Sequence, residues 1–86
     1  MYYVYALKSS KNGDLYIGFA RDLKKRVEQH NKGLSNYTKR YAPWLLIYYE
    51  AYRNKFDATK REKRLKLNHR AKEDLKLQIT KSWGKQ

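Results

Sequence analysis

One carboxylate stands alone in the most cationic stretch of this 86-residue chain. Glu62 is surrounded by the basic residues at positions 60, 61, 63, 64 and 66. In a helix it lies between Ala58 and Leu65, on the side that we expect to face the interior. A buried carboxylate needs a cation or hydrogen-bond donors around it. Two interpretations therefore stay open: an ion pair with a nearby Lys or Arg, or an oxygen ligand for Mg²⁺ or Mn²⁺.

An earlier segment offers a guanidinium and an imidazole on one helical face. Residues 22–31 predict a helix that Asp22 caps and that ends before Gly33. Leu23 and Val27 mark its apolar stripe. Arg26 and His30 lie beside that stripe, one turn apart, so we expect both to face a sheet. The alternatives are a solvated arginine and a histidine that is only partly buried or that compensates the helix dipole.

The first twenty residues predict the sheet that receives these side chains. Segments 2–7 and 15–19 are rich in β-branched and aromatic residues, and residues 9–14 between them suit a turn, which together favour a β-hairpin. If Leu7 pairs with Asp14, Tyr5 faces Tyr16 across the hairpin and Tyr3 faces Gly18. Side chains alternate along a strand, so these residues share one face. Gly18 then leaves a gap beside two phenols, which makes this face a candidate site.

The remaining chain predicts one more strand and two more helices. Residues 32–41 form an irregular connection, and residues 44–52 are the longest apolar run, which we place at the centre of the sheet. Helices follow at about 54–67 and 68–79, capped by Asn54 and Asn68. We expect Trp83 to fold back on the core and the tail 80–86 to be frayed. The expected fold is a single α+β domain over 1–86, with its core at about 2–78: a three-stranded antiparallel sheet flanked by helices, in the order β-β-α-β-α-α.

The charge of the chain indicates its partner. Lys and Arg number 21 against 8 acidic residues, a formal charge of +13, and there is no cysteine. A polyanion relieves such self-repulsion, and nucleic acid is the commonest one. The alternatives are a charged surface that only keeps the protein soluble and a basic helix that lies on anionic lipid. No apolar run has the length of a membrane span, so we expect a soluble, cytoplasmic protein and no membrane partner. The expected nucleic-acid contacts are Lys24, Lys25, Lys39, Arg40, Lys60, Arg61 and Arg64.

The order of these motifs resembles a known family. Tyr3-Val4-Tyr5 is followed ten residues later by Tyr16-Ile17-Gly18, then by Arg26, His30 and finally Glu62. This arrangement is similar to the GIY-YIG nuclease superfamily, specifically its small stand-alone bacterial members, which resemble the N-terminal domain of excinuclease C. The resemblance covers about residues 2–78. The first motif lacks the glycine that names the family, a change that many small members share.

The resemblance implies a divalent-metal-dependent endonuclease that hydrolyses phosphodiester bonds. Tyr5 and Tyr16 would line the site, and one of them would help to activate water. Arg26 would steady the charge on the phosphate and His30 would assist proton transfer or positioning. Glu62 would hold one Mg²⁺ or Mn²⁺ ion. Tyr3, Gly18 and Asn68 would line the phosphate site, although helix capping explains Asn68 equally well.

The substrate and the alternatives follow from the same residues. Tyrosines beside Lys and Arg suit stacking of unpaired bases, so we expect DNA that is branched, nicked or single-stranded, more than RNA. The chain shows no appended recognition domain, so we expect modest sequence specificity, or specificity supplied by a recruiting protein partner of a monomer. One alternative is a non-catalytic nucleic-acid-binding module on the same scaffold. The other is a small RNase that needs no metal.

Overall fold

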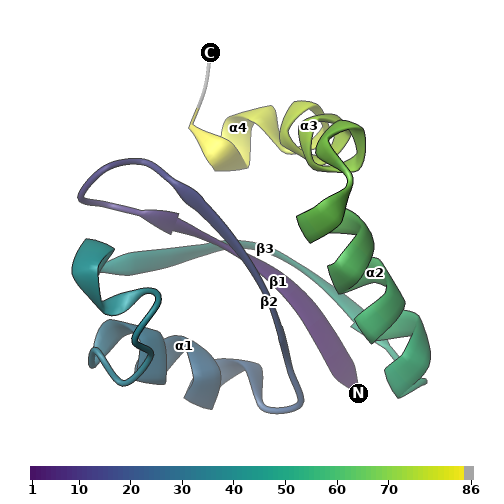
Figure 1. Cartoon of the computed structure of the whole chain (residues 1–86), viewed down its shortest axis with the longest axis horizontal. Helices are drawn as coiled ribbons and strands as arrows, with labels where there is room; N and C mark the ends of the chain where they lie inside the picture. The colour runs from purple at the N-terminus through teal and green to yellow at the C-terminus, as the bar shows by residue number, and fades with distance from the viewer. Residues whose placement is uncertain (85–86) are drawn as a thin grey trace.

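The computed structural model describes residues 1–84 and has the predicted α+β architecture. Three strands form an antiparallel sheet in the order β2-β1-β3 (Figure 1). One apolar cluster joins the sheet to α1 and the other joins its opposite face to α2, α3 and α4. Within residues 1–84 no helix is long and apolar enough to cross a membrane. The elements are β1 (Tyr2–Ser9), β2 (Leu15–Ala20), α1 (Leu23–Asn31), the 3₁₀-helix η1 (Lys39–Tyr41), β3 (Trp44–Tyr52), α2 (Lys55–Leu67), α3 (His69–Gln78) and α4 (Thr80–Trp83).

The hairpin register differs from the predicted one by two residues. Tyr5 pairs with Gly18, and Leu7 pairs with Tyr16. The expected pairing of Leu7 with Asp14 is wrong because β1 continues to Ser9, whose backbone N–H donates to the Asp14 carbonyl at 2.9 Å. A slip of two residues preserves the face of every side chain. The prediction that the hairpin tyrosines share one face with Gly18 therefore survives the error in register.

The central strand is β1, and the prediction that residues 44–52 occupy the centre is wrong. The four consecutive side chains from Val4 to Leu7 are at most 1% exposed. In β3, by contrast, Leu45 and Tyr49 are exposed. Helices cover both faces of the sheet, so an edge strand also contributes apolar residues to both core clusters. The long apolar run reflects those two covered faces and not a central position.

The helices begin where the sequence predicts. Asp22 accepts from the N–H of Lys25 at 3.1 Å, Asn54 from Phe56 at 2.8 Å, and Asn68 from Ala71 at 3.0 Å. Each bond satisfies an N–H that would otherwise lack a partner in the first helical turn. The caps thus fix the starts of α1, α2 and α3, and with them the faces that Arg26 and Glu62 present.

The C-terminal segment is more ordered than predicted. Residues 80–83 form α4, so the expectation of a frayed tail is wrong for them, whereas residues 85–86 lie outside the described part. Trp83 packs into the core, as predicted. The Lys8 ammonium donates to the backbone carbonyl of Trp83 at 2.8 Å and lies 5.2 Å from the centre of the Trp83 ring. The Lys76 ammonium lies 5.5 Å from the same ring centre. Burial of the indole between two lysines explains why the chain remains helical here.

Candidate active site

Tyr5 lies at the centre of the site, on the central strand. Its ring crosses the neighbouring strand directly over Gly18, and its side chain is 1% exposed. A Cβ added at Gly18 would lie 2.3 Å from both the Cζ and the hydroxyl oxygen of Tyr5. The sequence suggested that Gly18 leaves a gap on this face. In the structure the Tyr5 ring fills that space. Gly18 makes room for the Tyr5 phenol, which passes over the glycine towards the edge of the sheet.

His30 is the partner of the Tyr5 hydroxyl. The helical pattern predicts that it faces the sheet, and it is fully buried. The Tyr5 hydroxyl oxygen lies 2.8 Å from His30 Nε2, and His30 Nδ1 lies 2.6 Å from the hydroxyl oxygen of Thr38. A phenol that keeps its proton donates to Nε2, which leaves the proton of the neutral ring on Nδ1 to be donated to Thr38. Tyr5, His30 and Thr38 thus form one buried chain of hydrogen bonds.

Sequence reasoning missed the role of Thr38. A threonine in a polar loop carries no signal of its own, and its burial depends on how residues 32–43 fold back. Asn31 fixes that path, because its side chain accepts from the Trp44 N–H at 2.5 Å and donates to the Trp44 carbonyl at 3.0 Å. The indole N–H of Trp44 in turn donates to the Thr38 carbonyl at 2.8 Å. These contacts hold the Thr38 hydroxyl against His30.

Tyr16 lies beside this pair, at the edge strand. Its ring centre is 5.1 Å from that of His30 and 6.4 Å from that of Tyr5. The Lys66 ammonium lies 5.6 Å from the Tyr16 ring centre, and the Tyr37 ring centre is also 5.6 Å away. Tyr16 therefore connects the buried hydrogen-bond chain with the cationic helix α2 and with the surface loop.

Within residues 1–84 the two buried titratable groups, Tyr5 and His30, are neutral at pH 7. Burial raises the pKa of Tyr5 to about 12, with the nearby Tyr16 adding to the rise, while Arg26 opposes it and Glu62 adds a small further rise. Burial and, to a smaller extent, the charge of the Arg26 guanidinium together lower the pKa of His30 to about 4. In the free protein the phenol therefore keeps its proton, and His30 has an unprotonated Nε2.

The low pKa of His30 predicts a specific pH dependence of stability. In the unfolded chain histidine takes up a proton near pH 6.5, but folded His30 stays neutral until about pH 4. Its contribution to the free energy of unfolding is therefore complete above pH 6.5 and falls by about 3 kcal/mol as the pH drops to 4. Urea unfolding of wild type and His30→Gln across this range measures it. The difference in the free energy of unfolding between wild type and His30→Gln should shrink as the pH falls. As a control, His69→Gln, at an exposed position, should follow wild type at every pH. A His30→Gln curve parallel to that of wild type would contradict the prediction.

Arg26 and Glu62 bring opposite charges to the Tyr5 hydroxyl. Arg26 is half-buried and donates from Nη1 to Gln29 at 3.1 Å, while its charge acts on both Tyr5 and His30. The Glu62 side chain is 20% exposed and pairs with Lys66 at 3.1 Å. The ion pair that the sequence left open for Glu62 is thus present. The carboxylate nevertheless remains close enough to Tyr5 to raise the pKa of that phenol.

The donor set fits a hard divalent ion held by one protein ligand. Among residues 1–84 no group of three or more His, Cys, Asp or Glu side chains is placed to hold a metal. Mg²⁺ keeps most of its waters and binds through one or two carboxylates together with substrate phosphates. Glu62 beside Tyr5 meets that requirement, provided that Lys66 moves from the carboxylate.

Three predicted site residues lie elsewhere or have other partners. Tyr3 packs edge-on against Tyr49, 5.7 Å between ring centres, and lines a separate cavity of about 700 Å³ beside α1. Asn68 uses its side-chain oxygen to cap α3. Arg61 donates its single Nε–H to both carboxylate oxygens of Glu50, at 3.0 and 3.1 Å, and an Nη2–H to one of them at 3.0 Å. Burial alone would raise the pKa of Glu50, but bonds from Arg61, Tyr48 and Tyr52 outweigh it and hold that pKa below its usual value.

The other predicted nucleic-acid contacts are exposed at the surface. Lys39 and Arg40 lie on η1 and line a hollow of about 420 Å³ that Tyr16 also lines. Arg61 differs from them because Glu50 already neutralises its charge. The exposed set, on α1, η1 and α2, is Lys24, Lys25, Lys39, Arg40, Lys60 and Arg64.

Comparisons with known proteins identify a family model and several relatives of this chain. Residues 1–76 match the family model of the GIY-YIG catalytic domain. The chain is 44% identical over 72 residues to UPF0213 proteins of Staphylococcus aureus strains Mu50 and N315, which covers 83% of this chain and 87% of those proteins. The solution NMR structure of a UPF0213 protein from Bacillus halodurans superimposes with a TM-score of 0.54 at 35% identity. That match covers 87% of this chain and 82% of the other.

Proposed function

Because this chain belongs to the GIY-YIG family, a family of nucleases, we propose that it is a divalent-metal-dependent endonuclease acting on DNA. The observation that carries the proposal is the hydroxyl of Tyr5, hydrogen-bonded to a neutral buried histidine with Arg26 and Glu62 on either side. A structural tyrosine needs one hydrogen-bond partner; it does not need a guanidinium and an inward carboxylate as well. Phosphodiester hydrolysis needs a proton acceptor, a cation on the phosphoryl oxygens and a Lewis acid.

The hydrogen-bond chain supplies the proton acceptor. A water that attacks phosphorus passes a proton to the Tyr5 oxygen as the phenol passes its own proton to His30 Nε2, so that Tyr5 ends neutral and His30 becomes imidazolium. Because the pKa of His30 is about 4, protonation of His30 at pH 7 costs about 4 kcal/mol. The anionic phosphate offsets part of that cost when it enters beside Arg26 and neutralises the charge that disfavours the imidazolium. Thr38 holds the ring in the required tautomer.

Arg26 and Glu62 act on the phosphate and on the ion. The half-buried guanidinium stabilises the charge that develops on the phosphoryl oxygens, where a low local dielectric strengthens the effect. A Mg²⁺ or Mn²⁺ ion held by Glu62 would act as the Lewis acid on the same oxygens. The exposed cations of α1, η1 and α2 would bind the flanking phosphates of branched, nicked or single-stranded DNA, with the protein acting as a cytoplasmic monomer.

A cleavage assay on wild type tests this proposal. End-labelled single-stranded, duplex, nicked and branched DNA, and an RNA of the same sequence, are incubated with the protein in Mg²⁺, Mn²⁺ or EDTA. We expect DNA cleavage with either ion and none in EDTA. Cleavage of RNA in EDTA would show a metal-free RNase instead. Salt-sensitive binding without cleavage in any mixture would show a binding module on the same scaffold and would overturn the proposal.

A further inference from the structure

Tyr37 is an exposed aromatic side chain that leans on the candidate active site. Its side chain is 78% exposed, and its ring centre lies 5.6 Å from that of Tyr16 at an interplanar angle of 43°. Tyr16 itself contacts the buried His30 ring. One side of the Tyr37 ring thus lies against the site and the other meets solvent. None of the roles derived above for the hydrolytic residues uses Tyr37.

Tyr37 and Tyr16 separate two hollows in the surface. The first, about 500 Å³, is lined by residues of β2, α2 and α3 and is called here the α3 hollow. The second, about 420 Å³, lies towards η1 and carries Lys39 and Arg40. The two tyrosines line both hollows, so a chain that runs from one to the other crosses the candidate active site. The α3 hollow is lined by Leu15, Tyr16, Ile17, Tyr37, Lys66 and Lys72.

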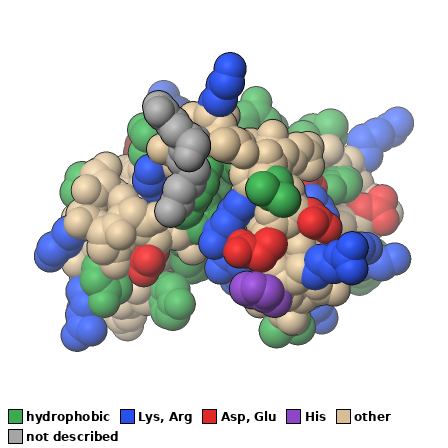
Figure 2. Space-filling model, turned by 90° about the horizontal axis from the view of Figure 1, so that it is seen from above, with side chains coloured by type: hydrophobic (Ala, Val, Ile, Leu, Met, Phe, Trp, Pro, Cys, Tyr) green, Lys and Arg blue, Asp and Glu red, His purple; other side chains and the backbone are tan. Residues whose placement is uncertain are grey.

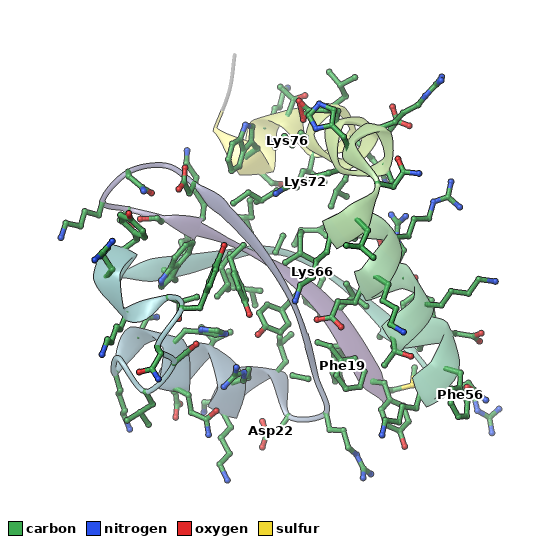
Figure 3. The ribbon with its side chains drawn as sticks, viewed as in Figure 1. Phe19, Asp22, Phe56, Lys66, Lys72 and Lys76 are labelled. Carbon is green, nitrogen blue, oxygen red and sulfur yellow. The ribbon has the colours of Figure 1, made fainter. Side chains whose placement is uncertain are left out.

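The charge in the α3 hollow favours an anionic occupant. Lys66 and Lys72 both line it; Lys66 lies over the Tyr16 ring and is paired with Glu62 in the absence of substrate. Figure 3 shows that Lys66, Lys72 and Lys76 lie on the side of α2 and α3 that faces the strands, whereas Phe56 lies at the opposite end of α2. Viewed from above, Lys and Arg side chains lie around the outline of the molecule and also near its middle (Figure 2). An exposed aromatic face beside two ammonium groups suits a base and its phosphate.

We propose that the α3 hollow binds an unpaired nucleotide of the substrate strand, with its base stacked on Tyr37 and its phosphate on Lys72 and Lys66. A base inside a duplex already has both faces covered by its neighbours, so it offers no face to Tyr37. The hollow therefore selects DNA with unpaired bases next to the cleaved bond. This inference rests on the proposed nuclease function and assigns its substrate class to particular side chains.

Equilibrium binding in EDTA tests the stacking contact without requiring cleavage. A fluorescent twelve-nucleotide single strand and the matching blunt duplex are titrated with wild type, Tyr37→Ala, Tyr37→Phe and Phe56→Ala. Phe56 is the matched control because it is 79% exposed but lies at the far end of α2. We expect Tyr37→Ala to weaken single-strand binding by about tenfold, as loss of one aromatic–base stack does, and duplex binding by less than about twofold. Tyr37→Phe and Phe56→Ala should bind like wild type.

The lysine contact has a separate readout in the same assay. Lys72→Ala should reduce the slope of log affinity against log salt by about 0.7 for the single strand, the value for one lost phosphate contact. Lys55→Ala, on the exposed start of α2, should reduce that slope less. The proposal is overturned if Tyr37→Ala binds the single strand like wild type, or if it loses single-strand and duplex binding equally. Because the assay contains no metal, these results are independent of whether the protein cleaves DNA.

Discussion

A Glu62→Gln variant is expected to lose about a thousandfold of DNA cleavage in Mg²⁺. Glutamine keeps the shape of the side chain but removes the charge that would hold the ion beside Tyr5. The fold should persist, because glutamine keeps the shape of the side chain and an i,i+4 pair within one helix, such as Glu62–Lys66, contributes about 0.5 kcal/mol or less. Cleavage rates and urea unfolding, measured on the same preparation, separate the two effects.

Glu73→Gln is the matched control for this variant. Glu73 pairs with Lys76 within one turn of α3, at 3.3 Å, as Glu62 pairs with Lys66 at 3.1 Å. Its substitution should leave cleavage within about twofold of wild type. Lys66→Ala removes the ion pair and the proposed phosphate contact but keeps the Glu62 carboxylate, so it should lose far less cleavage than Glu62→Gln; equal losses would mean that Glu62 only positions Lys66. Cleavage by Glu62→Gln at the wild-type rate would refute a metal-holding role.

The helical period accounts for what the sequence could predict about this site. Residues three and four apart share a helical face, so the positions of Leu23 and Val27 predict that His30 faces the sheet. The positions of Ala58 and Leu65 likewise predict that Glu62 faces the interior. On strands the period of two placed the tyrosines and Gly18 on one face even though the register was displaced by two residues. Faces are local properties, and local pattern determines them.

What the sequence could not give depends on contacts between distant segments. The path of the Tyr5 ring over Gly18 follows from the true pairing partner, which the length of the turn decides. The position of Thr38 follows from the two hydrogen bonds between Asn31 and the Trp44 backbone. The edge position of β3 follows from its pairing with β1 on one side only, and its apolar run follows from the two core clusters on the two faces of the sheet. None of these arrangements has a periodic signal, so pattern alone does not reach them.

The close contact between Gly18 and Tyr5 predicts the second large effect. A methyl group at position 18 would lie 2.3 Å from the Tyr5 Cζ and hydroxyl oxygen, well inside van der Waals contact, so in Gly18→Ala the ring must leave its place. The ring would lose its burial and its bond to His30, which together make an expected loss of about 4 kcal/mol in the free energy of unfolding. Cleavage should fall about a hundredfold or more in the fraction that remains folded, because the proton acceptor has moved.

A double-mutant cycle with Tyr5→Leu identifies the ring as the cause. Tyr5→Leu alone removes the phenol and the buried hydrogen bond, and it vacates the space above Gly18. If the clash is with the ring, Gly18→Ala should cost less than about 1 kcal/mol on the Tyr5→Leu background, so the two losses are far from additive. Additive losses would mean that Gly18 is required for its backbone and not for the phenol above it. The same cycle leaves cleavage absent whenever Tyr5 is changed, because Gly18 makes room for the hydroxyl that passes the proton to His30.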